Sequence, residues 1–181
     1  MPRYRRKRSR SYKISRRHLS KYSNETYGGV FWINNTFNNG VYAKPEIIPA
    51  TTILGTRKAK NFTIDIYCSY STETEDGTVS ASSTTLFWAL VYVPEGTNAG
   101  NFSFVPVNSN DYLSFYEPNQ NVIMSGIVDS SHVCRLKSKL ARNLNSGDTI
   151  TLIVYDPRAG SATHSYVLNV GYTINYALSF S

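Results

Sequence analysis

Apolar and polar residues alternate with a period of two through much of this chain, and this alternation limits what the chain can fold into. In residues 62–70, every second position is apolar or aromatic: Phe62, Ile64, Ile66, Cys68 and Tyr70. Successive side chains of a β-strand point to opposite faces, so the pattern predicts a half-buried strand. Residues 85–93 (TLFWALVYV) are almost continuously apolar, which is typical of a strand buried on both faces.

Turn signals separate further strand-like segments, and no segment has the apolar spacing of a helix of three turns. The expected strands comprise residues 27–33, 62–70, 85–93, 112–116, 121–128, 132–139, 149–155 and 172–180. Longer loops are expected at residues 34–60 and 94–111. About eight antiparallel strands in a chain of this size predict an all-β domain, either a single jelly-roll sandwich or a closed barrel.

The positive charge of the chain is concentrated at its start. The first 21 residues contain ten of the nineteen Lys and Arg residues and no Asp or Glu. The remaining residues contain nine basic and twelve acidic residues, a net charge of −3. Repulsion between like charges and a scarcity of apolar side chains oppose folding of the first segment. We therefore expect a disordered arm at residues 1–24 and a folded domain at residues 25–181.

The arm has the composition of a nucleic-acid-binding segment. Arginine outnumbers lysine in it, and the planar guanidinium forms paired hydrogen bonds with phosphate oxygens. Tyr4 and Tyr12 lie among the cations, where they can stack on unpaired bases. We predict that the arm binds single-stranded nucleic acid through ten residues: Arg3, Arg5, Arg6, Lys7, Arg8, Arg10, Lys13, Arg16, Arg17 and Lys21. The run Arg5, Arg6, Lys7 and Arg8 also matches a nuclear import signal. A tail that only improves solubility is the alternative.

A second basic group lies in the strand expected at residues 132–139. Arg135, Lys137 and Lys139 occupy every second position, which places them on one face of that strand. One interpretation is a secondary basic patch that contacts nucleic acid. The other is a solvated strand face or a set of ion pairs between subunits.

The sequence has no convincing catalytic or metal-binding pattern. Asp129, Ser131 and His132 have the residue types of a hydrolytic triad, but such triads are assembled from separate segments of a chain. We interpret them as a loop that leads into a strand. The chain is therefore predicted to be no enzyme and to bind no metal, cofactor or small-molecule substrate. It has no apolar run of about 18 residues, so no membrane association is predicted. Cys68 and Cys134 are expected to be buried thiols.

Four segments together carry a likeness to a known family. They are the start MPRYRRKRSRSY, residues 91–96 (VYVPEG), residues 116–123 (YEPNQNVI) and residues 140–155 (LARNLNSGDTITLIVY). The chain resembles capsid proteins of small viruses with circular single-stranded DNA genomes, the circovirus-like group. It is also similar to coat proteins of satellite RNA viruses. The resemblance implies a jelly-roll shell domain whose copies close into an icosahedral shell around single-stranded nucleic acid, with DNA favoured over RNA. It further implies a protein found in the virion and, during assembly, in the host nucleus.

Two other functions stay open at this point. A non-viral β-barrel protein that binds single-stranded nucleic acid would also use a basic tail. Such a barrel usually carries Lys and Arg along a groove beside aromatic platforms, and the body sequence shows only the one basic face. A carbohydrate-binding β-sandwich leaves the arm unexplained.

Overall fold

The computed structural model describes residues 21–34, 41–43, 45–71, 85–97, 105–106, 113–114, 121–156 and 167–180. The chain is all-β in these residues, and they contain no helix that is long and apolar enough to cross a lipid bilayer. The strands are β1 (Ser23–Asn34), β2 (Val41–Ala43), β3 (Glu46–Ile48), β4 (Arg57–Ser71), β5 (Thr85–Val93), β6 (Val105–Pro106), β7 (Leu113–Ser114), β8 (Asn121–Asp129), β9 (Cys134–Leu144), β10 (Thr149–Tyr155) and β11 (Val167–Phe180).

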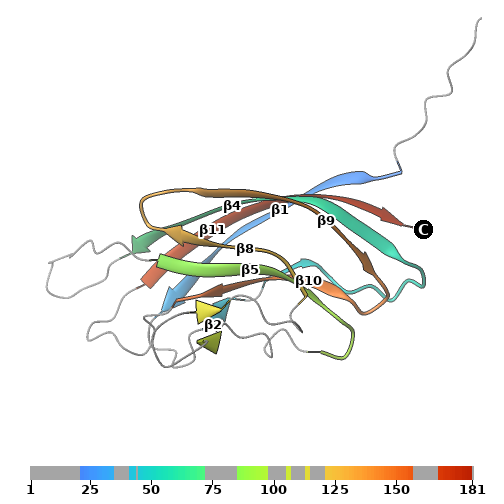
Figure 1. The fold of residues 1–181 in the computed structure, drawn as a ribbon, viewed down its shortest axis with the longest axis horizontal. Coiled ribbons are helices and arrows are strands. Elements are labelled where there is room, and N and C mark those ends of the chain that lie inside the picture. Colours follow the sequence, from blue (N-terminus) through green and yellow to red (C-terminus); the bar gives the residue numbers. More distant parts are fainter. Residues whose placement is uncertain are drawn as a thin grey trace, which may run out of the picture.

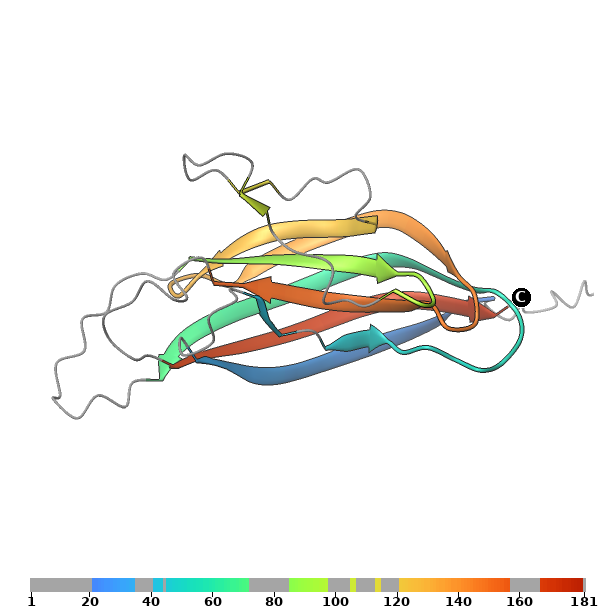
Figure 2. The same ribbon diagram turned by 90° about the horizontal axis from the view of Figure 1, so that it is seen from below.

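Two antiparallel sheets form the two layers of a sandwich (Figure 1). The first sheet has the strand order β1-β11-β4-β9 and the second has the order β2-β10-β5-β8, with β3 also paired to β10. The first strand therefore pairs with the last, β2 and β3 pair with β10, β4 with β9, and β5 with β8. A long hairpin rolled up in this way is a jelly roll, and Figure 2 shows the two layers from a second side. The predicted jelly-roll sandwich is confirmed, and the closed-barrel alternative is wrong because the strands form two separate sheets.

The core lies between the two layers, where the alternating residues of both sheets meet. Phe62, Ile64 and Ile66 of β4 are fully buried there, and so are Trp88 and Leu90 of β5. The intervening residues of β5 belong to a smaller apolar cluster on the other side of the second sheet, which contains Ala89, Val91, Val93 and Ile153. β5 is thus buried on both faces, as its continuous apolar run predicts.

A β-bulge in β4 shifts the phase of its alternation. In the pairing of β4 with β11, Lys60 is opposite Ala177 and Thr63 is opposite Asn175, so Asn61 and Phe62 together face the single residue Tyr176. Asn61 has a positive φ of 57°. Asparagine tolerates this left-handed conformation better than most residues. Because of the extra residue, Ala59 and Phe62 both face the core although they are three positions apart.

The end of the sandwich at which β1 begins is called the arm end below. β11 ends there and β4 begins there, since Phe180 pairs with Arg57. Arg57 is buried and donates hydrogen bonds to the carbonyl oxygens of Pro49 (2.7 Å) and Asp148 (2.9 Å). Burial lowers the pKa of Arg57, while the nearby charge of Asp148 acts to raise it. This cluster links the start of β4 to the turn before β10.

Several predicted boundaries agree with the structure, but short strands lie within both predicted loops, including β6 in the loop predicted at residues 94–111. β5 and β10 have the bounds expected from the sequence. The loop predicted at residues 34–60 is wrong in part, because β2, β3 and the first residues of β4 lie within it. The strand predicted at residues 112–116 contributes only β7 to the described residues. β1 already begins at Ser23, two residues before the predicted start of the folded domain.

Candidate nucleic-acid interface

Most of the predicted arm lies outside the described residues. This includes nine of its ten cations and the predicted import signal, Arg5, Arg6, Lys7 and Arg8. Lys21 is described and is exposed just before β1. The neighbouring residue Tyr22 is half-buried, and the Lys60 ammonium lies 3.6 Å from the centroid of its ring. The arm therefore joins the body beside a lysine of β4.

The basic residues of the body gather on two neighbouring strands. Seven of the nine Lys and Arg residues after position 21 belong to β4 or β9: Arg57, Lys58, Lys60, Arg135, Lys137, Lys139 and Arg142. These strands pair along most of their length, with Lys58 opposite Asn143, Lys60 opposite Ala141 and Thr63 opposite Lys137. The jelly-roll topology thus brings together two basic segments that are more than seventy residues apart in the chain.

Four of these cations line the outer face of the first sheet, the face turned away from the core. Lys58 is exposed between two buried residues, and Lys60 follows two positions later. Lys137 and Arg135 are exposed on β9, which is an edge strand of this sheet. Side chains at alternating positions share a face of a sheet, so the four cations form a basic track along the β4–β9 seam.

Arg135 is neutralised by an ion pair within this face. Its guanidinium donates to both carboxylate oxygens of Asp65, across 2.5 Å and 3.0 Å. The hydrogen bond from Arg135 lowers the pKa of Asp65. An exposed pair of this kind contributes little to stability. Among the described residues, no carboxylate contacts the other three cations of the track, Lys58, Lys60 and Lys137.

All three residues of the predicted secondary patch are exposed on β9. Arg135 and Lys137 lie on the outer face, as their spacing predicts. Lys139 lies two positions farther along β9, where β9 and β4 change register. The sequence analysis missed Lys58 and Lys60, because only the pairing of β4 with β9 places them beside the patch. A role of any of these residues in binding nucleic acid stays a prediction.

Two aromatic side chains lie on the same outer face, farther from the arm end. Trp32 of β1 is 72% exposed, and Tyr67 of β4 is 46% exposed. Tyr67 pairs with Gly171 of β11, and a Cβ atom at this glycine would collide with the Tyr67 ring. The Tyr67 ring therefore lies directly over Gly171, against the surface of the sheet. Cations and exposed aromatic rings thus share one face.

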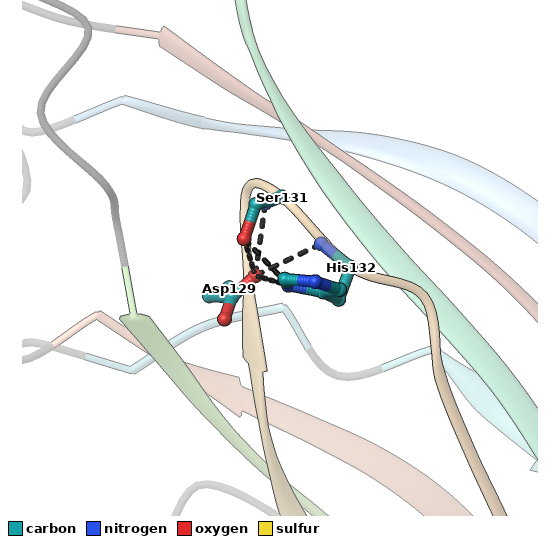
Figure 3. Close-up of polar contacts among 3 residues, drawn as sticks. All are labelled: Asp129, Ser131 and His132. Atoms are coloured by element: carbon teal, nitrogen blue, oxygen red, sulfur yellow. Dashed lines mark hydrogen bonds and ion pairs between the residues drawn. The ribbon is translucent and has the colours of Figure 1, made fainter.

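The loop between β8 and β9 holds the residues that resemble a hydrolytic triad (Figure 3). Asp129 Oδ1 accepts hydrogen bonds from the Ser131 amide (2.9 Å), the Ser131 hydroxyl (2.6 Å) and the His132 amide (2.9 Å). These bonds, above all those from Ser131, lower the pKa of Asp129 to about 2. Both Asp129 Oδ1 (3.3 Å) and Ser131 Oγ (2.6 Å) face the same histidine nitrogen, Nδ1. In a triad the acid and the nucleophile contact opposite ring nitrogens, so this arrangement is a carboxylate-stabilised turn.

Cysteine and acidic side chains form no metal site in the described part of the chain. No group of three or more His, Cys, Asp or Glu side chains there could hold a metal ion. Cys68 is buried on β4 and Cys134 is half-buried on β9, and no disulfide joins them. Burial raises the pKa of the Cys134 thiol.

Comparison with known proteins adds no relative to these observations. The chain matches no protein-family model, and none of the curated proteins compared with it is significantly similar.

Proposed function

We propose that this chain is a viral capsid protein. In this proposal its jelly-roll bodies assemble into a small closed icosahedral shell, and its basic N-terminal arm packages single-stranded nucleic acid. The distribution of charge is the observation that carries the proposal. Ten cations precede β1, and seven of the nine body cations lie on β4 and β9. One side of the body is therefore suited to phosphate, while the rest carries the acidic excess and can pack against copies without strong repulsion.

Exposed apolar side chains support self-association. Leu54 is 90% exposed in the segment between β3 and β4, next to the exposed Ile53. A second group lies along β8, β9 and the loop between them, and it consists of Ile127, Val133, Leu136 and Leu140. Single exposed apolar residues are common on monomeric proteins, but groups of them are typical of contact surfaces. We infer that these two groups take part in contacts between subunits.

The arm supports packaging of nucleic acid and entry into the nucleus. Contacts to phosphate through its cations are independent of base sequence and depend steeply on salt. If all ten cations contact a single strand, the slope of log affinity against log salt approaches about −7. The favoured genome is DNA, which rests on the resemblance to circovirus-like capsid proteins. A virion location, with assembly in the host nucleus, follows from the same resemblance and from the run at residues 5–8.

Electron microscopy of the purified full-length protein tests this proposal. Uniform closed particles with a high ratio of absorbance at 260 nm to that at 280 nm are expected. A variant with glutamine at all ten arm cations should keep its β-sheet circular dichroism and lose the nucleic acid. A variant with lysine at the seven arm arginines is the matched control, because it keeps the charge and changes only the geometry of the phosphate contacts. It should retain nucleic acid with a similar salt slope.

A dispersed monomer that binds single strands would contradict the capsid proposal. That result would favour the alternative, a non-viral protein that binds single-stranded nucleic acid with a basic tail. The exposed aromatic rings on the same face as the lysines of the first sheet are the observation that supports this alternative.

A further inference from the structure

We propose that the outer face of the first sheet is a second binding surface for single-stranded nucleic acid. On this face Trp32 and Tyr67 stack on unpaired bases. Lys58, Lys60 and Lys137 contact the phosphates of the same strand. This inference rests on the proposed packaging function and adds to it the class of ligand, a strand with unpaired bases, and a site on the folded body.

The two aromatic rings are placed as separate platforms. Trp32 pairs with Asn169, and Tyr67 pairs with Gly171, two residues farther along β11. One strand lies between β1 and β4, so the two positions are about 10 Å apart across the strands and about 7 Å apart along them. The glycine beneath Tyr67 lets its ring lie against the sheet rather than stand away from it. Two bases of one strand can stack on rings spaced in this way, and such stacking tolerates any base sequence.

The three lysines form a path that leads from the arm end toward these rings. From Lys58 to Tyr67 along β4 the distance is about 30 Å, enough for several nucleotides. Asp65 is the acidic residue on this path, and Arg135 neutralises it. The other acidic residue of the sheet, Glu25, pairs with Tyr176, which is on the core side of the sheet. The face is therefore cationic although residues 22–181 carry a net charge of −3.

A strand of nucleic acid suits this face better than a second copy of the chain does. The centres of protein–protein interfaces are depleted of lysine, and facing lysines on two copies would repel. A duplex would offer phosphate to the lysines but no exposed base to the rings. The outer side of the second sheet differs from this cationic, exposed face, because its residues Ala89, Val91 and Ile153 are apolar and buried.

Tryptophan fluorescence of the full-length protein, dispersed at moderate salt, gives a direct test. The chain has two tryptophans: Trp88 is fully buried and Trp32 is largely exposed, so a ligand that stacks on the face quenches Trp32. Short oligothymidylate should quench the emission. Inorganic polyphosphate and the same oligonucleotide annealed to its complement should bind the arm without this quenching. The variant Trp32→Phe should bind oligothymidylate with little loss and show no quenching.

Affinity at high salt provides the second measurement, because salt screens the arm more than it weakens stacking. The variants Trp32→Ala and Tyr67→Ala should each weaken oligothymidylate binding on the order of tenfold. Ile127→Ala is the matched control, since Ile127 is an exposed apolar residue of the second sheet, and it should leave the affinity unchanged. Circular dichroism checks that each variant is folded.

Three results would overturn the inference. Polyphosphate could quench the emission as strongly as oligothymidylate does, or both alanine variants could keep their affinity. The third result is a change in Trp32 emission as the protein concentration rises in the absence of nucleic acid. The last result would assign the face to contacts between copies. Filled particles from a Trp32→Ala, Tyr67→Ala double variant with unchanged affinity would sink this inference and leave the packaging function standing. Quenching that requires unpaired bases, in a protein that never forms particles, would support the binding face and contradict the capsid proposal.

Discussion

Replacement of Asp148 by alanine should remove much of the stability of the sandwich. This carboxylate is 3% exposed and lies at the arm end. Its Oδ2 atom accepts hydrogen bonds from the Tyr92 hydroxyl (2.8 Å) and the Asn145 amide (2.7 Å), and its Oδ1 atom accepts one from the Glu95 amide (3.0 Å). One side chain thus joins the end of β5, the segment after it and the turn between β9 and β10.

The expected loss follows from these three bonds. A hydrogen bond to a charged acceptor contributes about 1.5 to 3 kcal/mol. Asn145 and Glu95 are exposed residues whose amides water can reach in the variant, so the lower value applies and the total is about 4.5 kcal/mol. The buried Arg57 guanidinium would also lose the favourable interaction with the Asp148 charge, which lowers stability further. Since domains of this size are stable by about 5 to 15 kcal/mol, the loss is a large share of the total.

Urea unfolding of the dispersed protein, followed by circular dichroism and by the emission of buried Trp88, measures this free energy. A double-mutant cycle with Tyr92→Phe isolates the bond between Tyr92 and Asp148, and a coupling energy of about 1 kcal/mol or more is expected. Burial and the bond to Asp148 together raise the pKa of Tyr92 to about 12, so this pKa should fall in Asp148→Ala. A loss below about 1 kcal/mol with an unchanged urea slope would refute the reasoning. Asp129→Ala is the matched control, because Asp129 also accepts three hydrogen bonds but does so in an exposed turn, and its effect should be much smaller.

Two further predictions concern single residues. The folded pKa of Asp129 is about 2, below its ordinary value of 3.8. The contribution of Asp129 to stability is therefore present above pH 3.8 and is lost as the pH falls through about 2. Carboxyl NMR titration should show this pKa, and a value near 3.8 would contradict the turn geometry. Asn61→Gly should preserve or slightly raise the free energy of unfolding. Asn61→Val should lower it by about 1 to 2 kcal/mol, because a β-branched residue is strained at a φ of 57°. Equal urea midpoints for the two variants would contradict the bulge.

The sequence predicts the long strands well because their patterns are strong. β5 and β10 are continuous apolar runs bounded by turn residues, and both have the predicted bounds. β2 and β3 have three residues each, too few to show a period, and they exist because they pair with β10. The predicted loop at residues 34–60 therefore hides elements that only tertiary pairing creates.

The basic surface is predictable only in part, because it also depends on tertiary pairing. Alternation alone places Arg135 and Lys137 on one face. Lys58 and Lys60 join them through a register between distant strands, and the bulge at Asn61 decides on which side of β4 they lie. Without the extra residue, a strict alternation from Phe62 back to Lys58 would turn both lysines toward the core. The local pattern could not reveal this, since it spans the point at which the phase changes.

The position of the arm makes even a weak site on the first sheet useful to the proposed packaging function. Lys21 is next to Tyr22, and the contact of Tyr22 with Lys60 fixes the exit of the arm beside the start of the lysine path. A strand held by the arm meets the sheet as an intramolecular ligand, at an effective concentration in the millimolar range for short connections. A face with a dissociation constant near 1 mM for a few nucleotides, about 4 kcal/mol of binding, would then be substantially occupied. The arm can therefore supply capture at long range, while the sheet needs only enough affinity to order the strand against the body.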